Sequence, residues 1–91
     1  MPIHAAELNT IFLFCNEYKS IPLIVRLYED IVIGVIRQSN SGKKMFEIKT
    51  DFFTRDDSNI CKLLHALKEI FPDLSIYTRE HNAGCLIIVE W

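Results

Sequence analysis

Residues 56–72 have the sequence DDSNICKLLHALKEIFP, and this stretch carries the clearest structural signal in the chain. Asp56, Asp57 and Ser58 offer a helix N-cap and place negative charge at the positive end of the helix dipole. Pro72 ends the helix, because proline lacks a backbone N–H and clashes with the preceding turn. Apolar residues recur at helical spacing between these two signals: Ile60, Leu63, Leu64, Leu67, Ile70 and Phe71. The pattern predicts an amphipathic helix.

The sequence that follows this helix predicts a β-hairpin. Leu74 to Arg79 and Cys85 to Trp91 are rich in strand-forming residues. Residues 81–84, with the sequence His-Asn-Ala-Gly, supply turn formers between them. We therefore expect two antiparallel strands at this end of the chain.

Three further strands are expected before the helix. Leu23 to Tyr28 and Ile31 to Gln38 are rich in β-branched residues and are separated only by Glu29 and Asp30, which favours a tight hairpin. Residues 39–42, Ser-Asn-Ser-Gly, favour a second turn, so Lys44 to Thr50 is expected to return antiparallel. These strands form a predicted meander.

The first element is predicted as an amphipathic helix over Ala5 to Tyr18, although Thr10 to Cys15 is also compatible with a strand. The resulting order is α-β-β-β-α-β-β. It predicts a single α+β domain over residues 1–91, with a mainly antiparallel sheet of about five strands and two helices. This order resembles that of the heart-shaped chaperones of bacterial type III secretion. That resemblance implies a small acidic homodimer that binds unfolded segments of other proteins.

Composition narrows the classes of function. Of the 91 residues, 49% are hydrophobic and 24% are charged, which is typical of a soluble globular domain. The net charge of −2 disfavours broad electrostatic binding to nucleic acid. Residues 1–10 lack the pattern of a signal peptide, and apolar runs such as 11–15 are far shorter than the roughly 20 residues of a membrane span. We expect a cytoplasmic protein with no membrane partner.

The cysteines and histidines do not form a recognised chemical motif. Cys15, Cys61 and Cys85 are odd in number and lie in apolar segments, as reduced core thiols do. Cys61 and His65 have the i, i+4 spacing of two metal ligands or of a thiol and its base, and His81 with Cys85 would complete a set of four. No Cys-x-x-Cys pair or catalytic signature supports either role. We therefore predict no enzyme activity, no metal and no cofactor.

One face of the predicted sheet is the candidate binding surface. If Leu23, Val25 and Leu27 point inward, aromatic and basic side chains gather on the opposite face: Arg26, Tyr28, Lys49, Tyr77 and Arg79. Such residues anchor protein interfaces, and they also stack on the bases of single-stranded RNA. A plain surface without function is the third interpretation. Trp91 is a further candidate, since a tryptophan at the end of a strand can fix an interface or close a core.

Two of the expected strands are apolar at both alternating positions, namely Ile31 to Ile36 and Cys85 to Val89. Such strands are normally covered on both faces, here by a helix on one side and by the first helix, a second subunit or a partner on the other. We therefore predict a non-enzymatic interaction domain of inhibitor, adaptor or chaperone type. It docks on another protein and forms a homodimer. The alternative is a module that binds single-stranded RNA through the aromatic and basic face.

Overall fold

The computed structural model describes the backbone of residues 5–91 and the side chains from residue 8 onward. It contains three helices and three strands: α1 (Ala5–Glu17), α2 (Pro22–Asn40), β1 (Met45–Thr50), α3 (Ser58–Ile70), β2 (Ser75–His81) and β3 (Gly84–Glu90). The strands form one antiparallel sheet in the order β1-β3-β2. An α+β fold with an antiparallel sheet is thus confirmed, whereas five strands with two helices is wrong.

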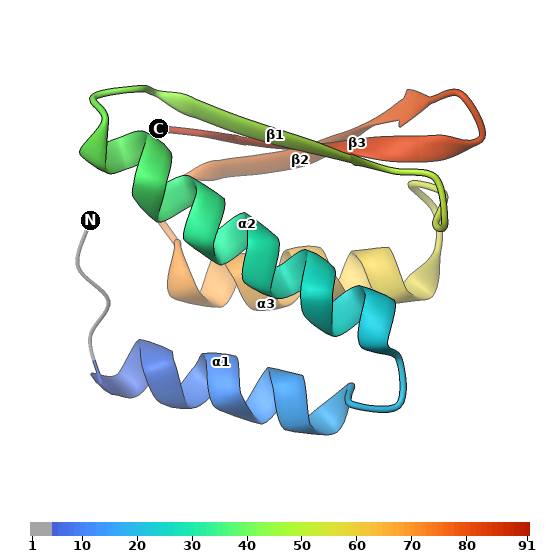
Figure 1. Ribbon diagram of the computed structural model, residues 1–91, viewed down its shortest axis with the longest axis horizontal. Coiled ribbons are helices and arrows are strands. Elements are labelled where there is room, and N and C mark those ends of the chain that lie inside the picture. The colour runs from blue at the N-terminus through green and yellow to red at the C-terminus, as the bar shows by residue number, and fades with distance from the viewer. Residues whose placement is uncertain (1–4) are drawn as a thin grey trace.

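The elements are stacked in three layers (Figure 1). Helices α2 and α3 lie against one face of the sheet, and α1 lies on the far side of these two helices. The opposite face of the sheet carries no helix within residues 5–91. Strand β3 lies in the middle of the sheet, so both β1 and β2 are edge strands.

The predicted hairpin of residues 23–38 is wrong, because this segment is the long helix α2. Pro22 occupies the first turn of α2, where its missing N–H costs no hydrogen bond. The buried residues follow a helical spacing: Ile24, Leu27, Tyr28, Ile31, Val32 and Val35. The pair Glu29 and Asp30 lacks the glycine that a two-residue hairpin favours, and both side chains lie on the exposed side of α2. With the meander gone, the element order no longer resembles that of the secretion chaperones.

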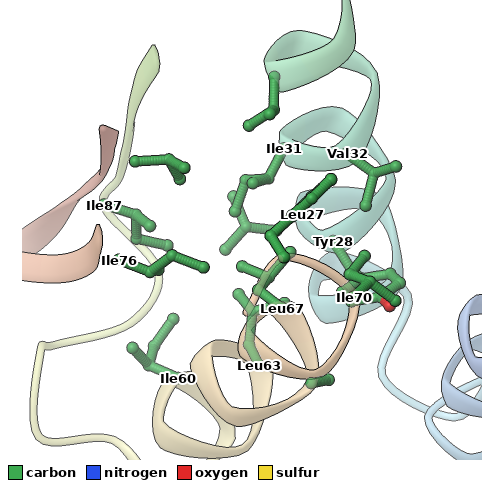
Figure 2. Packing of buried hydrophobic residues seen from close by; sticks show 14 of the residues in the cluster. Leu27, Tyr28, Ile31, Val32, Ile60, Leu63, Leu67, Ile70, Ile76 and Ile87 are labelled. Atoms are coloured by element: carbon green, nitrogen blue, oxygen red, sulfur yellow. The ribbon is translucent and has the colours of Figure 1, made fainter. Parts of the chain in front are cut away.

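The core lies between the sheet and the helices α2 and α3 (Figure 2). Its largest fully buried side chains come from α2, α3 and β3: Ile24, Tyr28, Ile31, Ile60, Leu63, Leu67 and Ile87. Gly34 brings α2 close to β1, because a Cβ atom at this position would overlap the ring of Phe46. The glycine therefore allows a close approach between this helix and the strand.

Strand β3 is apolar at both alternating positions, but the reason differs from the one expected. Ile87 and Val89 face the helices and belong to the core. Leu86 and Ile88 face the open side of the sheet, where Ile88 pairs with Glu47 and Tyr77 on its two neighbouring strands. Ile88 is nonetheless only 4% exposed. A strand in the middle of a sheet can thus be apolar on both faces because its neighbours, rather than another subunit, cover its outer side.

We predict that Gly84→Ala strongly destabilises the fold. A Cβ atom on Gly84 would overlap the carbonyl oxygen of Thr50 and crowd the backbone of Asp51, so the end of β1 would have to move. We expect the free energy of unfolding to fall by about 3 kcal/mol in urea denaturation. Gly42→Ala is the matched control, since Gly42 has φ +78° but open space around it. We expect this control to lose only about 1 kcal/mol. Equal losses in the two variants would contradict the close packing of Gly84.

Candidate interaction surface on α1

The residues expected on one face lie on two sides of the sheet, although Arg26 and Lys49 line a common cleft at the edge of β1. Lys49, Tyr77 and Arg79 do share the open face of the sheet, as the strand register requires. Arg26 and Tyr28 lie on α2, on the other side of the sheet. Arg26 is exposed and lies 4.0 Å from the carboxylate of Asp30, whereas Tyr28 is completely buried. The expected aromatic and basic face is therefore only partly present.

The residues that remain on the open face interact with each other and balance their charges. The hydroxyl of Tyr77 donates a hydrogen bond of 2.6 Å to Glu90, and this bond raises the pKa of the tyrosine. The guanidinium of Arg79 lies 5.8 Å from the centroid of the Tyr77 ring. Glu47 and Glu90 share this face with Lys49 and Arg79. The face thus has no excess of positive charge for binding phosphates.

Trp91 follows β3 directly and is fixed by the backbone. Its N–H donates a hydrogen bond of 3.0 Å to the carbonyl oxygen of Lys44, just before β1 begins. The indole ring is partly buried against the core. In this position the tryptophan covers one end of the sheet.

Helix α1 carries the densest group of exposed apolar side chains. Leu8 and Leu13 are each 56% exposed, and Phe12 is 69% exposed. Asn9 and Asn16 are exposed on the same side of the helix. We refer to Leu8, Asn9, Phe12, Leu13 and Asn16 as the α1 outer surface.

The opposite side of α1 anchors the helix to the core. Phe14 is buried and stacks on Tyr28 of α2, with ring centroids 4.3 Å apart. Tyr18 follows one turn later and packs on Phe14 at 4.6 Å. Lys62 of α3 places its ammonium group 5.9 Å from the Tyr18 ring centroid. These contacts fix which side of α1 remains exposed.

The α1 outer surface has the composition of an interface core. Between residues 8 and 17, the only charged residue of α1 is Glu17. Protein interfaces are depleted of charge at their centre and enriched in aromatic residues, as Phe12 is here. A helix with apolar residues on both sides is normally covered on both sides. The signal in the sequence that indicates this surface is the width of the apolar stripe on the helix, because the apolar residues from Leu8 to Phe14 extend beyond one helix face.

A cleft runs along the seam between α1 and α3. It has a volume of about 540 Å³, and Leu13 and Phe14 line it from α1. Cys61, His65 and Ala66 line it from α3. Because Leu13 belongs both to this cleft and to the α1 outer surface, the two features are continuous.

The thiol and imidazole groups differ in their exposure and in their partners. Cys61 is exposed, and His65 Nε2 lies 3.4 Å from the carboxylate of Glu69. Cys15 donates a weak hydrogen bond of 3.9 Å to Glu29, and burial and this carboxylate raise the pKa of its thiol. Burial also raises the pKa of Cys85. Within residues 5–91, no group of three histidine, cysteine or acidic side chains is arranged to hold a metal ion.

Comparison with known proteins gives no relative to which a function can be traced: the chain matches no family model, no curated protein and no solved structure. Among the helices of the described residues, none has the length and apolar character needed to cross a membrane.

We predict that the three thiols react with iodoacetamide in the order Cys61, Cys15, Cys85. Cys61 is exposed, whereas Cys15 is partly buried and Cys85 is buried. The raised pKa values of Cys15 and Cys85 also lower their thiolate fractions at any given pH, and the thiolate is the reactive form. Mass spectrometry of the native protein at pH 8 should show modification of Cys61 first. Early modification of Cys85 would contradict its position in the core.

We predict that Tyr28→Phe stabilises the protein. The Tyr28 hydroxyl is buried and has no hydrogen-bond partner among the described residues. Burial of an unpaired hydroxyl costs free energy that phenylalanine avoids, while the ring keeps its stacking on Phe14. We expect the free energy of unfolding to rise by about 1 kcal/mol in urea denaturation. Tyr18→Phe is the matched control and should change little, so a loss of stability confined to Tyr28→Phe would show that the hydroxyl has a partner.

Proposed function

We propose that this protein is a non-enzymatic interaction domain that forms a homodimer through the α1 outer surface and docks in that form on another protein. The observation that carries this proposal is the exposure of Leu8, Phe12 and Leu13 on a helix whose other side is anchored in the core. An inhibitor, adaptor or chaperone role is consistent with such a domain. The other exposed large apolar side chains among the described residues are Leu23, Ile33, Met45 and Phe52. They are not gathered on one helix face, although Leu23 and Phe52 line a common cleft beside β1.

The size of the apolar patch supports this choice of surface. Three large side chains that are each more than half exposed present an apolar area on the order of 300 Å². A patch of this size is at the lower end of the range for the largest apolar patch on a monomeric protein, and such patches are often functional. The open face of the sheet is less suited to this role, because Ile88 is already covered and charged residues surround it.

The RNA-binding alternative receives less support from the arrangement of its residues. An RNA-binding sheet presents aromatic rings to bases and cations to phosphates. Here Tyr28 is buried, and Tyr77 is bonded to Glu90 and lies beneath Arg79. This arrangement therefore favours docking on a protein over binding of RNA.

We predict that Phe12→Asp abolishes self-association. A buried charge at the centre of an apolar interface costs several kcal/mol unless it is paired. Sedimentation equilibrium over a range of protein concentrations should show a mass approaching twice 10.6 kDa for the wild type and 10.6 kDa for the variant.

Phe52→Asp provides the matched control for this experiment. Phe52 is 72% exposed, close to the 69% of Phe12, but it lies in the loop after β1. The control variant should dimerise like the wild type. A wild-type protein that stays monomeric, or a control that dissociates as Phe12→Asp does, overturns the assignment of α1 as the interface. Circular dichroism of both variants checks that the helices are retained.

A further inference from the structure

We infer that the outer edge of β1 binds an extended segment of the partner protein as a fourth, antiparallel strand of the sheet. This inference rests on the proposed docking on another protein, and it adds the docking surface and the chemistry of the segment that is bound. It follows from four features of β1: its unpaired backbone groups, the width of the helix layer beneath it, the cleft beside it, and the alternation of its side chains.

Alternate residues of β1 have backbone groups that no other strand within residues 5–91 uses. In an antiparallel pair, every second residue exchanges both of its hydrogen bonds with the neighbouring strand, and the residues between point both groups away. The hydrogen bond from the N–H of Trp91 to the carbonyl oxygen of Lys44 marks one bonded pair. The register then gives the other bonded positions of β1: Phe46, Ile48 and Thr50. The residues that direct N–H and C=O groups to the outer edge are Met45, Glu47 and Lys49.

The helix layer is wider than the sheet that it covers. Helix α2 packs on β1 and α3 packs on β2, so the two helices lie against the two edge strands (Figure 1). Three strands at a spacing of about 4.8 Å span about 14 Å. Two helices, each about 10 Å in diameter, span about 20 Å. The side of α2 that extends past β1 therefore leaves room for one more strand.

A cleft lies between the first half of α2 and the second half of β1, and it has a volume of about 230 Å³. Leu23 lines it from α2, Ile48 from β1, and Phe52 from the loop after β1. Leu23 is 46% exposed and Phe52 is 72% exposed, so both can contact a bound segment. Arg26 and Asp30 also line the cleft, and they lie 4.0 Å apart with opposite charges. A residue of the added strand opposite Ile48 points toward α2, where an apolar side chain fits.

The open face of β1 determines the charges of the bound segment. Glu47 and Lys49 are exposed on this face, two positions apart. Side chains directly opposite each other in an antiparallel pair interact, so opposite charges stabilise the pair and like charges destabilise it. The segment therefore carries an acidic residue opposite Lys49 and a basic residue opposite Glu47. With an apolar residue opposite Ile48, the segment reads acidic, apolar, basic from its N-terminus.

The edge of β2 is less suited to this role. The residues of β3 that do not bond β1 bond β2 instead, and this leaves outward backbone groups at Ile76, Thr78 and Glu80. Glu80 lies on the same side of the sheet as the buried Ile76, because four positions separate them. A charged side chain that points inward at an edge opposes the addition of a strand. The residues of β1 on that side carry no charge: Phe46, Ile48 and Thr50.

A second copy of this chain does not fit the edge of β1 in the same way. Two β1 strands paired about a two-fold axis lie about 4.8 Å apart, with both α2 helices on the same side of the joined sheet. Each α2 packs on its own β1, so the two helices would lie closer together than the roughly 8 Å that packed helices need. An extended segment of another protein brings no such helix. The edge of β1 therefore suits a partner better than self-association.

Hydrogen exchange with a designed peptide tests this inference in the intact protein. The peptide Arg-Val-Glu-Leu-Lys-Val-Thr places its Glu opposite Lys49, its Leu opposite Ile48 and its Lys opposite Glu47. In the free protein, NMR should show fast exchange of the outward amides and slow exchange of the bonded ones. With the peptide, exchange should become at least about tenfold slower at the outward amides, namely those of Met45, Glu47 and Lys49. The amides of Thr78 and Glu80 on β2 should not change.

Two controls separate strand addition from other modes of binding. The Glu and Lys of the peptide direct their N–H groups at β1, so N-methylation of both should weaken binding by at least about tenfold. N-methylation of the Leu, whose N–H points away from β1, should change binding by only a few-fold. A peptide with its Glu and Lys exchanged should bind the wild type more weakly. The double variant Glu47→Lys and Lys49→Glu should bind that exchanged peptide better than the original one.

The possible outcomes distinguish this inference from the proposed homodimer. Outward amides that stay unprotected at about 1 mM peptide, or binding that tolerates N-methylation of the Glu and Lys, overturn the inference. The mass measured by sedimentation decides the homodimer separately. Slow exchange of the outward amides in the free protein also overturns the inference, because the edge is then already covered by a second copy or by another part of the chain. A monomeric wild type that binds the peptide at this edge supports the inference and overturns the homodimer alone.

Discussion

The rest of the structure depends on the burial of α2 on two sides. Leu27, Ile31 and Gly34 face the sheet, where Gly34 allows β1 to come within contact distance. Tyr28 lies on the opposite side of α2, where its ring stacks on that of Phe14 of α1. Without α2, the sheet would lose the helix that covers β1, and α1 would lose the ring on which it stacks. The helix therefore positions the outer layer as well as the core.

The elements that could be predicted most accurately from the sequence are those specified by neighbouring residues. Helix α3 is confirmed close to its expected limits, and Asp57 caps it by accepting a hydrogen bond of 2.8 Å from the backbone N–H of Asn59. The final hairpin is confirmed, with Asn82 in the turn at a positive φ of 53°. Strand β1 is confirmed as well, within one residue of its expected start. In each of these cases, capping residues, turn formers or strict alternation determine the structure over a few neighbouring residues.

The error over residues 23–38 shows why composition alone is a poor guide for a buried helix. Isoleucine and valine favour strands because they fit a pleated, half-buried surface, but tertiary packing can place them equally well in a helix. The helical spacing from Ile24 to Val35 was present in the sequence, and it was outweighed by the β-branched residues. The candidate surface was affected by the same error, because Arg26 and Tyr28 were placed on a strand that does not exist. The exposure of the α1 outer surface could not be predicted from the sequence, because it depends on which side of α1 packs against Tyr28.

The order β1-β3-β2 also has a consequence for how the chain reaches this fold. The middle strand, β3, is the last of the three in the sequence, so β1 has no strand to pair with until residues 84–90 are available. During synthesis on the ribosome, α1, α2 and β1 are made first. Part of their apolar surface stays uncovered until the later strands have been made. Long-range pairing of this kind slows folding and prolongs the exposure of aggregation-prone segments. The sheet can thus be complete only after both strands of the final hairpin have been made.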